Sequence, residues 1–148
     1  MSVQPIEWLD DKVRIIDQTK LPQKEVYIET ADYRQVASAI RKLQVRGAPA
    51  IGVAGAYGIA LGALAIEADS IAEFMKKFKR VSKVIAGTRP TARNLFYAVE
   101  RMERAAEAGK TVDDIKAKLV KEAIKINKTE ADATKKLSSF GAGLIKDG

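Results

Sequence analysis

The segment from Ala48 to Ile66 contains no charged side chain, and it constrains the fold more than any other part of the sequence. A segment of this length could cross a bilayer as a helix. However, it holds four glycines, many alanines and only two leucines, and no second apolar segment of similar length follows it. These features are typical of a small-residue helix that packs closely against its neighbours. We therefore predict a buried helix in a soluble core, with no membrane association.

The residues before this segment predict a small sheet. Apolar and polar residues alternate in three short runs, at 6–9, 12–17 and 25–30. The pairs Asp10-Asp11 and Leu21-Pro22 separate the runs and are turn signals. The simplest arrangement is an antiparallel β-meander whose apolar face packs on helices.

Helical spacing governs the remainder of the chain, because apolar residues recur every three or four positions on one face. Capping and breaking residues then predict the helix boundaries. The expected helices run from Asp32 to about Leu43 (with Leu43 on the buried face), from Pro49 through the charge-free segment, from the capping box Ser70–Glu73 to just before Gly87, from Pro90 to Gly109, and from Thr111 onward. The predicted fold class is α+β, with a small N-terminal antiparallel β-meander followed by a mainly helical bundle.

The residue inventory narrows the possible chemistry. The chain has 148 residues and is 47% hydrophobic, which fits one folded domain. It contains no cysteine and no histidine, so these residues supply no thiol nucleophile, no thiolate metal site and no imidazole base. No carboxylate cluster has the spacing of a magnesium site. We therefore expect no cofactor or metal here, and any chemistry must use Arg, Lys, Asp, Glu, Tyr, Ser, Thr or backbone groups.

The net charge of +7, from 26 basic and 19 acidic residues, has three interpretations. It could bind nucleic acid, attract a small anionic substrate, or belong to one half of a larger and better-balanced protein. The basic residues are spread along amphipathic helices, without a basic tract that alternates with aromatics, and this does not favour nucleic-acid binding. High lysine and glutamate content without cysteine is typical of a thermophile. Since the segment Met1–Pro5 has no features of a signal peptide, we expect a cytoplasmic protein.

The first motif with chemical potential is Arg46 to Gly52, Arg-Gly-Ala-Pro-Ala-Ile-Gly. An arginine and a glycine hinge stand directly before a helix, where free backbone amides and the helix dipole favour an anion. The guanidinium of Arg46 adds a planar fork that suits phosphate. A structural interpretation is also open, in which Gly47 and Pro49 form a simple joint and the helix glycines allow close packing. Both interpretations can hold together.

The second motif is Gly87 to Leu95, in which Arg89 precedes Pro90 at an expected helix start. Two arginines, each beside a helix N-terminus, suggest that they converge on one anionic ligand. Arg93 is expected one turn further on, and it could instead be a surface cation. Three other features are less informative: Trp8 is expected in the core or an interface, Tyr57 is expected to be buried with a satisfied hydroxyl, and Asp17 to Pro22 is either part of a site or a turn that ends a strand.

Three segments together resemble a known family. Asp17 to Pro22, Arg46 to Gly58 and Gly87 to Leu95 are similar, in order and spacing, to methylthioribose-1-phosphate isomerases. This family belongs to a superfamily with archaeal ribose-1,5-bisphosphate isomerases and the regulatory subunits of eukaryotic translation initiation factor two B. The resemblance implies interconversion of 5-methylthioribose 1-phosphate and 5-methylthioribulose 1-phosphate in methionine salvage, by a cytoplasmic homodimer without a cofactor.

The same resemblance implies roles for particular residues. Arg46, Gly47 and Ala48 would contact a phosphorylated pentose substrate, and Arg89 would hold its phosphate region. The catalytic cysteine and aspartate of the family lie in a C-terminal Rossmann-like domain, which follows a segment resembling Phe140 to Gly148. That segment is expected to be a helix end followed by a turn. Residues 1–148 are therefore expected to form the N-terminal domain of a two-domain isomerase, with no catalytic residue of their own.

Two alternatives stay open at this point. The substrate could be ribose 1,5-bisphosphate, which keeps the chemistry and changes the sugar. Alternatively, the chain could be a non-catalytic regulatory or interaction module of the initiation-factor kind, in which the arginine pair is vestigial or senses a sugar phosphate.

Overall fold

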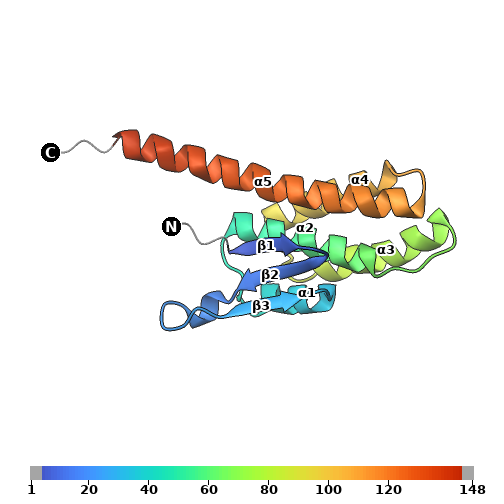
Figure 1. The fold of residues 1–148 in the computed structure, drawn as a ribbon, viewed down its shortest axis with the longest axis horizontal. Helices are drawn as coiled ribbons and strands as arrows, with labels where there is room; N and C mark the ends of the chain where they lie inside the picture. Colours follow the sequence, from blue (N-terminus) through green and yellow to red (C-terminus); the bar gives the residue numbers. More distant parts are fainter. Residues whose placement is uncertain (1–4, 145–148) are drawn as a thin grey trace.

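The computed structural model describes residues 5–144, in which a three-stranded antiparallel sheet precedes five α-helices (Figure 1). The strands β1 (Ile6–Leu9), β2 (Lys12–Ile16) and β3 (Tyr27–Thr30) lie in the order β1-β2-β3. The residue rows that face the helices are Ile6–Ile15–Ile28 and Trp8–Val13–Thr30. The α+β fold and the β-meander are thus confirmed.

The turn between β1 and β2 has the backbone that a two-residue hairpin needs. Asp10 and Asp11 both adopt left-handed conformations, with φ of 43° and 63°. Such a turn matches the right-handed twist of the two strands, and aspartate tolerates it better than most residues. The predicted turn at these two positions is confirmed.

The charge-free segment forms α2 (Ala48–Leu64), the central helix of the molecule. Every residue from Ile51 to Ala63 is buried. Helices α1, α3, α4 and α5 and strand β1 all contact it, and Figure 1 shows it between α5 on one side and the sheet on the other. Among the described residues, no helix is long and apolar enough to cross a membrane. The prediction of a buried core helix is confirmed.

Three glycines of α2 allow side chains of neighbouring helices to pack closely against it. A Cβ atom at Gly55 would lie 2.4 Å from Cδ1 of Leu95, and one at Gly62 would lie 2.3 Å from Cγ1 of Val81. At Gly58 the nearest atom, in Ile85, would be 2.8 Å away. Separations this short force a neighbour to move. The close-packing interpretation of these glycines is therefore confirmed.

Four amphipathic helices surround α2: α1 (Tyr33–Arg41), α3 (Ile71–Ala86), α4 (Arg93–Glu107) and α5 (Val112–Leu144). Each turns one apolar stripe toward the core, as the three- to four-residue spacing of its apolar residues predicts. The fully buried members include Val36, Ala39, Ile40, Phe74, Phe78, Leu95, Met102, Ile115 and Leu119.

One predicted helix end is wrong. The first helix ends at Arg41, and Leu43 is exposed, because its backbone turns to a left-handed φ of 60° and carries the side chain off the helical face. The last helix is described as far as Leu144, which lies within the segment Phe140 to Gly148 where a helix end is expected. The turn expected to follow this helix end within the same segment stays a prediction, because residues 145–148 lie outside the described residues. Figure 1 shows this last part of α5 extending beyond the bundle.

Candidate functional site

The start of α2 has no cap from its own side chains. The cap residue is Gly47, with φ of 92° and ψ of 135°, and no side-chain hydrogen bond closes this helix end. The helix begins at Ala48, so Pro49 is its second residue. The sequence predicted Pro49 as the first. The first helical hydrogen bond runs from the amide of Ile51 to the carbonyl of Gly47, at 2.9 Å. The amides of Ala48 and Ala50 therefore stand at the open end of the helix, where an anion could accept from them.

Position 47 favours glycine because of its backbone conformation, and not because neighbouring atoms would crowd a side chain. A Cβ atom built at this position would meet nothing within 4 Å. Its positive φ is a conformation that residues with a side chain rarely adopt. The site therefore combines a special backbone conformation with open space beside it.

Arg46 lies directly before this helix end and is exposed. Its Nε donates a hydrogen bond to the carbonyl oxygen of Leu43, at 3.3 Å. Within residues 5–144, the ion pairs are Lys77–Glu73, Arg101–Glu122 and Lys118–Asp114, so none engages Arg46. The anchored Nε fixes the direction of the side chain, and the terminal guanidinium nitrogens stay available to an anion.

Asp17 connects the first resembling segment to the loop that carries Arg46. It is buried, and its Oδ1 accepts from the amide (2.9 Å) and hydroxyl (2.5 Å) of Thr19. Its Oδ2 accepts from Nε2 of Gln44, at 2.9 Å. The hydroxyl bond from Thr19 is the largest of the effects that lower the pKa of Asp17, so the carboxyl is ionised at neutral pH. The segment Asp17 to Pro22 thus lies against the loop before α2.

The second motif differs from the prediction. α4 begins at Arg93 and not at Pro90, because Arg89 to Ala92 form a turn closed by a 3.0 Å hydrogen bond from the amide of Ala92 to the carbonyl of Arg89. Proline in the second position of such a turn is favoured for the same φ that favours it in a helix. Arg89 therefore lies in the loop before α4 and is half-buried, whereas Arg93 is the first helical residue and not one turn further on.

The hydroxyl of Thr88 is occupied within the fold. It donates to the carbonyl oxygen of Ile85 at 2.7 Å and is buried, so it ties the end of α3 to this loop. It is not available to a ligand. The ion pairs within residues 5–144 likewise do not involve Arg89.

The starts of α2 and α4 lie against each other. A Cβ atom at Gly52, one turn into α2, would be 3.1 Å from the carbonyl oxygen of Asn94, the second residue of α4. A small cavity of about 60 Å³ lies beside this contact, between α2, α4 and α5, and its lining includes Pro49, Tyr97 and Glu130 but neither Arg46 nor Arg89. The structure thus brings together the two helix starts that follow Arg46 and Arg89.

The start of α4 also lacks a side-chain cap, since its cap residue is Ala92. The other three helices are capped by their own side chains. Asp32 accepts from the amide of Arg34 at α1, Ser70 from Glu73 at α3, and Thr111 from Asp114 at α5. In the described chain, the two adjacent helix starts are the uncapped ones.

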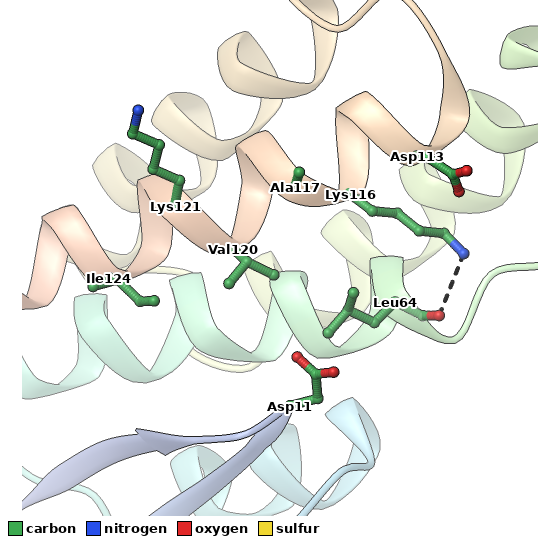
Figure 2. A pocket seen from close by; sticks show the side chains of 8 residues that line it. All are labelled: Asp11, Leu64, Asp113, Lys116, Ala117, Val120, Lys121 and Ile124. Carbon is green, nitrogen blue, oxygen red and sulfur yellow. Dashed lines mark hydrogen bonds between the residues drawn. The ribbon is translucent and has the colours of Figure 1, made fainter.

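A larger, open groove belongs to another part of the surface. Figure 2 shows it between α5, the end of α2 and the hairpin turn at Asp11, with a volume of about 580 Å³. Its floor is apolar, and Lys116 on its rim donates from Nζ to the carbonyl oxygens of Leu64 (3.4 Å) and Ile66 (2.6 Å). None of the four predicted site residues lines this groove, so it is not the candidate anion site.

Tyr57 belongs to the core, and the partly buried Trp8 packs against it. Their ring centroids are 5.4 Å apart, and the hydroxyl of Tyr57 accepts a 2.8 Å hydrogen bond from Nδ2 of Asn127. Burial raises the pKa of the Tyr57 hydroxyl, which stays protonated. The expectation that Tyr57 is buried with a satisfied hydroxyl is confirmed. Sequence reasoning did not select Gln44 or Asn94, whose roles come from contacts with residues far away in the chain.

Residues 44–148 match the initiation factor 2 subunit family. The chain belongs to this family. It is 53% identical over 146 residues to the methylthioribose-1-phosphate isomerase of Dehalococcoides mccartyi, covering 99% of this chain and 44% of that protein. The same enzyme of Geobacter metallireducens is 51% identical over 150 residues, covering 100% of this chain and 43% of the relative. The resemblance found in the sequence is thereby confirmed.

Two solved structures of the family have the same fold. The 5-methylthioribose 1-phosphate isomerase of Pyrococcus horikoshii OT3 superposes with a TM-score of 0.92 at 34% identity, over 97% of this chain and 41% of that one. The translation initiation factor eIF-2B subunit delta of A. fulgidus superposes with a TM-score of 0.91 at 42% identity, over 99% and 43%. The chain spans less than half the length of each of these relatives.

Proposed function

We propose that residues 1–148 form the N-terminal, substrate-positioning domain of a two-domain aldose–ketose isomerase. The complete protein would convert 5-methylthioribose 1-phosphate to 5-methylthioribulose 1-phosphate in methionine salvage. The observation that carries this proposal is the pair of adjacent, uncapped helix starts, each preceded by an arginine. The 53% identity to an enzyme named for this substrate supports the choice of sugar.

Each site residue has a physical role in this proposal. Arg46 would pair with the phosphate through its terminal nitrogens, while the glycine conformation at 47 would let the ligand reach the amide of Ala48. Arg89 would hold the phosphate region from the loop before α4. Each charge-assisted contact is worth about 1.5–3 kcal/mol, which is roughly ten- to a hundred-fold in affinity.

The proton transfer would come from the other domain. The described residues include no histidine or cysteine, and an aldose–ketose isomerisation needs an acid and a base beside C1 and C2 of the sugar. The resemblance assigns these to a cysteine and an aspartate of a Rossmann-like domain. The 148-residue chain alone is therefore expected to bind the sugar phosphate weakly and not to turn it over. The complete protein is proposed to be a cytoplasmic homodimer without a cofactor, and the lysine- and glutamate-rich composition points to a thermophile.

One observation favours a second candidate. The solved structure named as a subunit of translation initiation factor eIF-2B is 42% identical to this chain. In that case the basic surface and helices would bind a protein or RNA partner, and the arginine pair would be vestigial or would sense a sugar phosphate. Binding of RNA at physiological salt would favour this candidate, whereas its absence together with sugar-phosphate binding would favour the isomerase.

A hybrid enzyme tests the proposal. Residues 1–148 replace the corresponding part of the Dehalococcoides mccartyi isomerase, and the product is assayed with 5-methylthioribose 1-phosphate and with ribose 1,5-bisphosphate. Arg46→Ala and Arg89→Ala should each raise KM by about ten- to a hundred-fold. The control is Arg80→Ala, which removes an exposed arginine on α3. A folded hybrid that is active and insensitive to both site substitutions would contradict the assignment. Turnover of ribose 1,5-bisphosphate alone would assign that sugar as the substrate in place of 5-methylthioribose 1-phosphate.

A further inference from the structure

The loop between α1 and α2, which carries Arg46, contains two residues with a positive φ. Leu43 at one end has φ of 60° and Gly47 at the other has φ of 92°. Between them Val45 is buried, and its amide lies 3.4 Å from the carbonyl oxygen of Ala39, which also accepts from the amide of Gln44 at 2.9 Å. Two left-handed residues within five positions need support from the rest of the fold.

That support comes from the segment after β2. The amide of Gln18 donates to the carbonyl oxygen of Gln44 at 2.9 Å, and the side chain of Gln44 donates to Asp17 at 2.9 Å. Gln44 is therefore held through both its backbone and its side chain. It stands two residues before Arg46, so these bonds fix the position from which the arginine projects.

The charge of Asp17 matters for this contact. A carboxylate only accepts hydrogen bonds, so it selects the NH₂ end of the Gln44 amide and holds it in one orientation. In the described chain the hydrogen-bond donors to the carboxylate of Asp17 belong to Thr19 and Gln44, and no ion pair includes it. A buried carboxylate is costly unless it is well hydrogen-bonded. One oxygen of Asp17 thus organises its own turn, and the other organises the arginine loop.

We propose that Asp17 and Gln44 are positioning residues for the anion site, because they hold the Arg46 loop in its binding conformation before the ligand arrives. The inference rests on the proposed function, since it assumes that Arg46 binds a phosphate. Ordering the loop in advance removes the entropy that binding would otherwise have to supply. The two residues act through Arg46 and do not touch the ligand.

A matched pair of substitutions separates positioning from plain stability. Gln44→Met removes the hydrogen bond to Oδ2 and leaves the turn bonds at Oδ1 intact. Thr19→Val removes a hydrogen bond to Oδ1 and leaves the link to Gln44 intact. Each variant thus loses one bond to the same carboxylate, but only the first releases the loop.

Three quantities are measured on the 148-residue chain: the Tm, hydrogen exchange at the Val45 amide without ligand, and the dissociation constant for 5-methylthioribose 1-phosphate by NMR titration. Gln44→Met should weaken binding about ten-fold and speed exchange at Val45. Thr19→Val should lower Tm about as much as Gln44→Met does, but its affinity and its Val45 exchange should stay close to the wild-type values. Asp17→Asn, which can pair with a flipped Gln44 amide, should retain more affinity than Asp17→Ala.

Equal losses of affinity in Gln44→Met and Thr19→Val would overturn the proposal, as would unchanged Val45 exchange in Gln44→Met. If the wild-type chain binds neither this sugar phosphate nor inorganic phosphate, the proposed function fails. The exchange readout is taken without ligand, so it still decides whether Asp17 and Gln44 hold the loop.

Discussion

The helix starts of this molecule fall into two groups. α1, α3 and α5 are closed by Asp32, Ser70 and Thr111, each of which accepts from a backbone amide in the first turn. α2 and α4 begin at Gly47 and Ala92 without such a bond. A side-chain cap typically contributes about 1 kcal/mol, so leaving two caps out lowers stability. The two open helix ends follow Arg46 and Arg89 in the sequence and lie side by side. Their free amides are therefore suited to a hydrogen-bond acceptor from outside the chain.

The largest expected effect comes from closing one of the open ends. Ala92→Asp adds a cap whose negative charge also favours the helix dipole, so stability should rise by about 0.5–2 kcal/mol. The same charge would repel a phosphate, and affinity for 5-methylthioribose 1-phosphate should fall about a hundred-fold. Thermal unfolding and titration of the same sample check both effects. Ala92→Asn, which caps without a charge, is the control and should lose much less affinity. Unchanged affinity in Ala92→Asp would remove the start of α4 from the site.

The second substitution separates the start of α2 from its body. Gly62→Ala forces a Cβ atom against the stiff side chain of Val81, so the free energy of unfolding should fall by about 1–3 kcal/mol. Ligand affinity should not change, because this glycine lies near the far end of the helix. The control is Gly141→Ala, where the added Cβ meets nothing within 4 Å, and stability should stay the same or rise slightly. Urea titrations of the two variants measure the contrast. A destabilisation by Gly141→Ala as large as that by Gly62→Ala would contradict the packing account.

Removing the side-chain cap of a closed helix start should lower stability and leave ligand affinity unchanged. Ser70→Ala and Thr111→Ala should each lower stability by about 1 kcal/mol. Neither should alter sugar-phosphate affinity, because these caps hold only backbone amides of α3 and α5. Denaturant unfolding and a ligand titration of each variant test this. A ten-fold loss of affinity in either variant would remove the distinction between the two groups of helix starts.

The smallest effect is a pH dependence at the closed starts. A hydrogen bond from the backbone amide of Asp69 is the main cause that lowers the pKa of Glu73 below its ordinary value of 4.5. A hydrogen bond from the backbone amide of Lys110 is likewise the main cause that lowers the pKa of Asp114 below its ordinary value of 3.8. Because both folded pKa values are lowered, these groups stabilise the fold above their ordinary pKa values. That contribution is lost as the pH falls through the folded pKa values. The double variant Glu73→Gln with Asp114→Asn should therefore show a shallower loss of Tm below pH 4.5 than the wild type. Parallel curves would contradict this.

Local signals in the sequence predicted much of the fold. The capping box at Ser70–Glu73, the alternation in Ile6–Leu9 and the charge-free segment each determine an element through residues within a few positions of one another. The start of α4 was predicted wrongly, because Pro90 has a φ that suits both a helix and a turn. The hydrogen bond between Arg89 and Ala92 decides for the turn. Similarly, the apolar spacing continues to Leu43 after the backbone has left the helix.

The candidate site was predicted only in part. Arg46 and Arg89 could be named because each stands beside a glycine or proline that marks a helix start or turn. The helix starts that follow them are adjacent because of the contact between Gly52 and Asn94, which are far apart in the chain. Gln44 carries no local signal at all, since its role comes from Asp17. Such contacts arise only when the whole core has packed.

The most direct test of the central claim is an NMR titration of the 148-residue chain with 5-methylthioribose 1-phosphate, read at the backbone amides. We expect the largest shifts at Ala48 and Ala50 in α2 and at the start of α4, with little change at the closed starts of α1, α3 and α5. We also expect Arg46→Ala to reduce the shifts at both open starts. Shifts centred instead on the groove around Lys116, or spread evenly over the basic surface, would contradict the central claim.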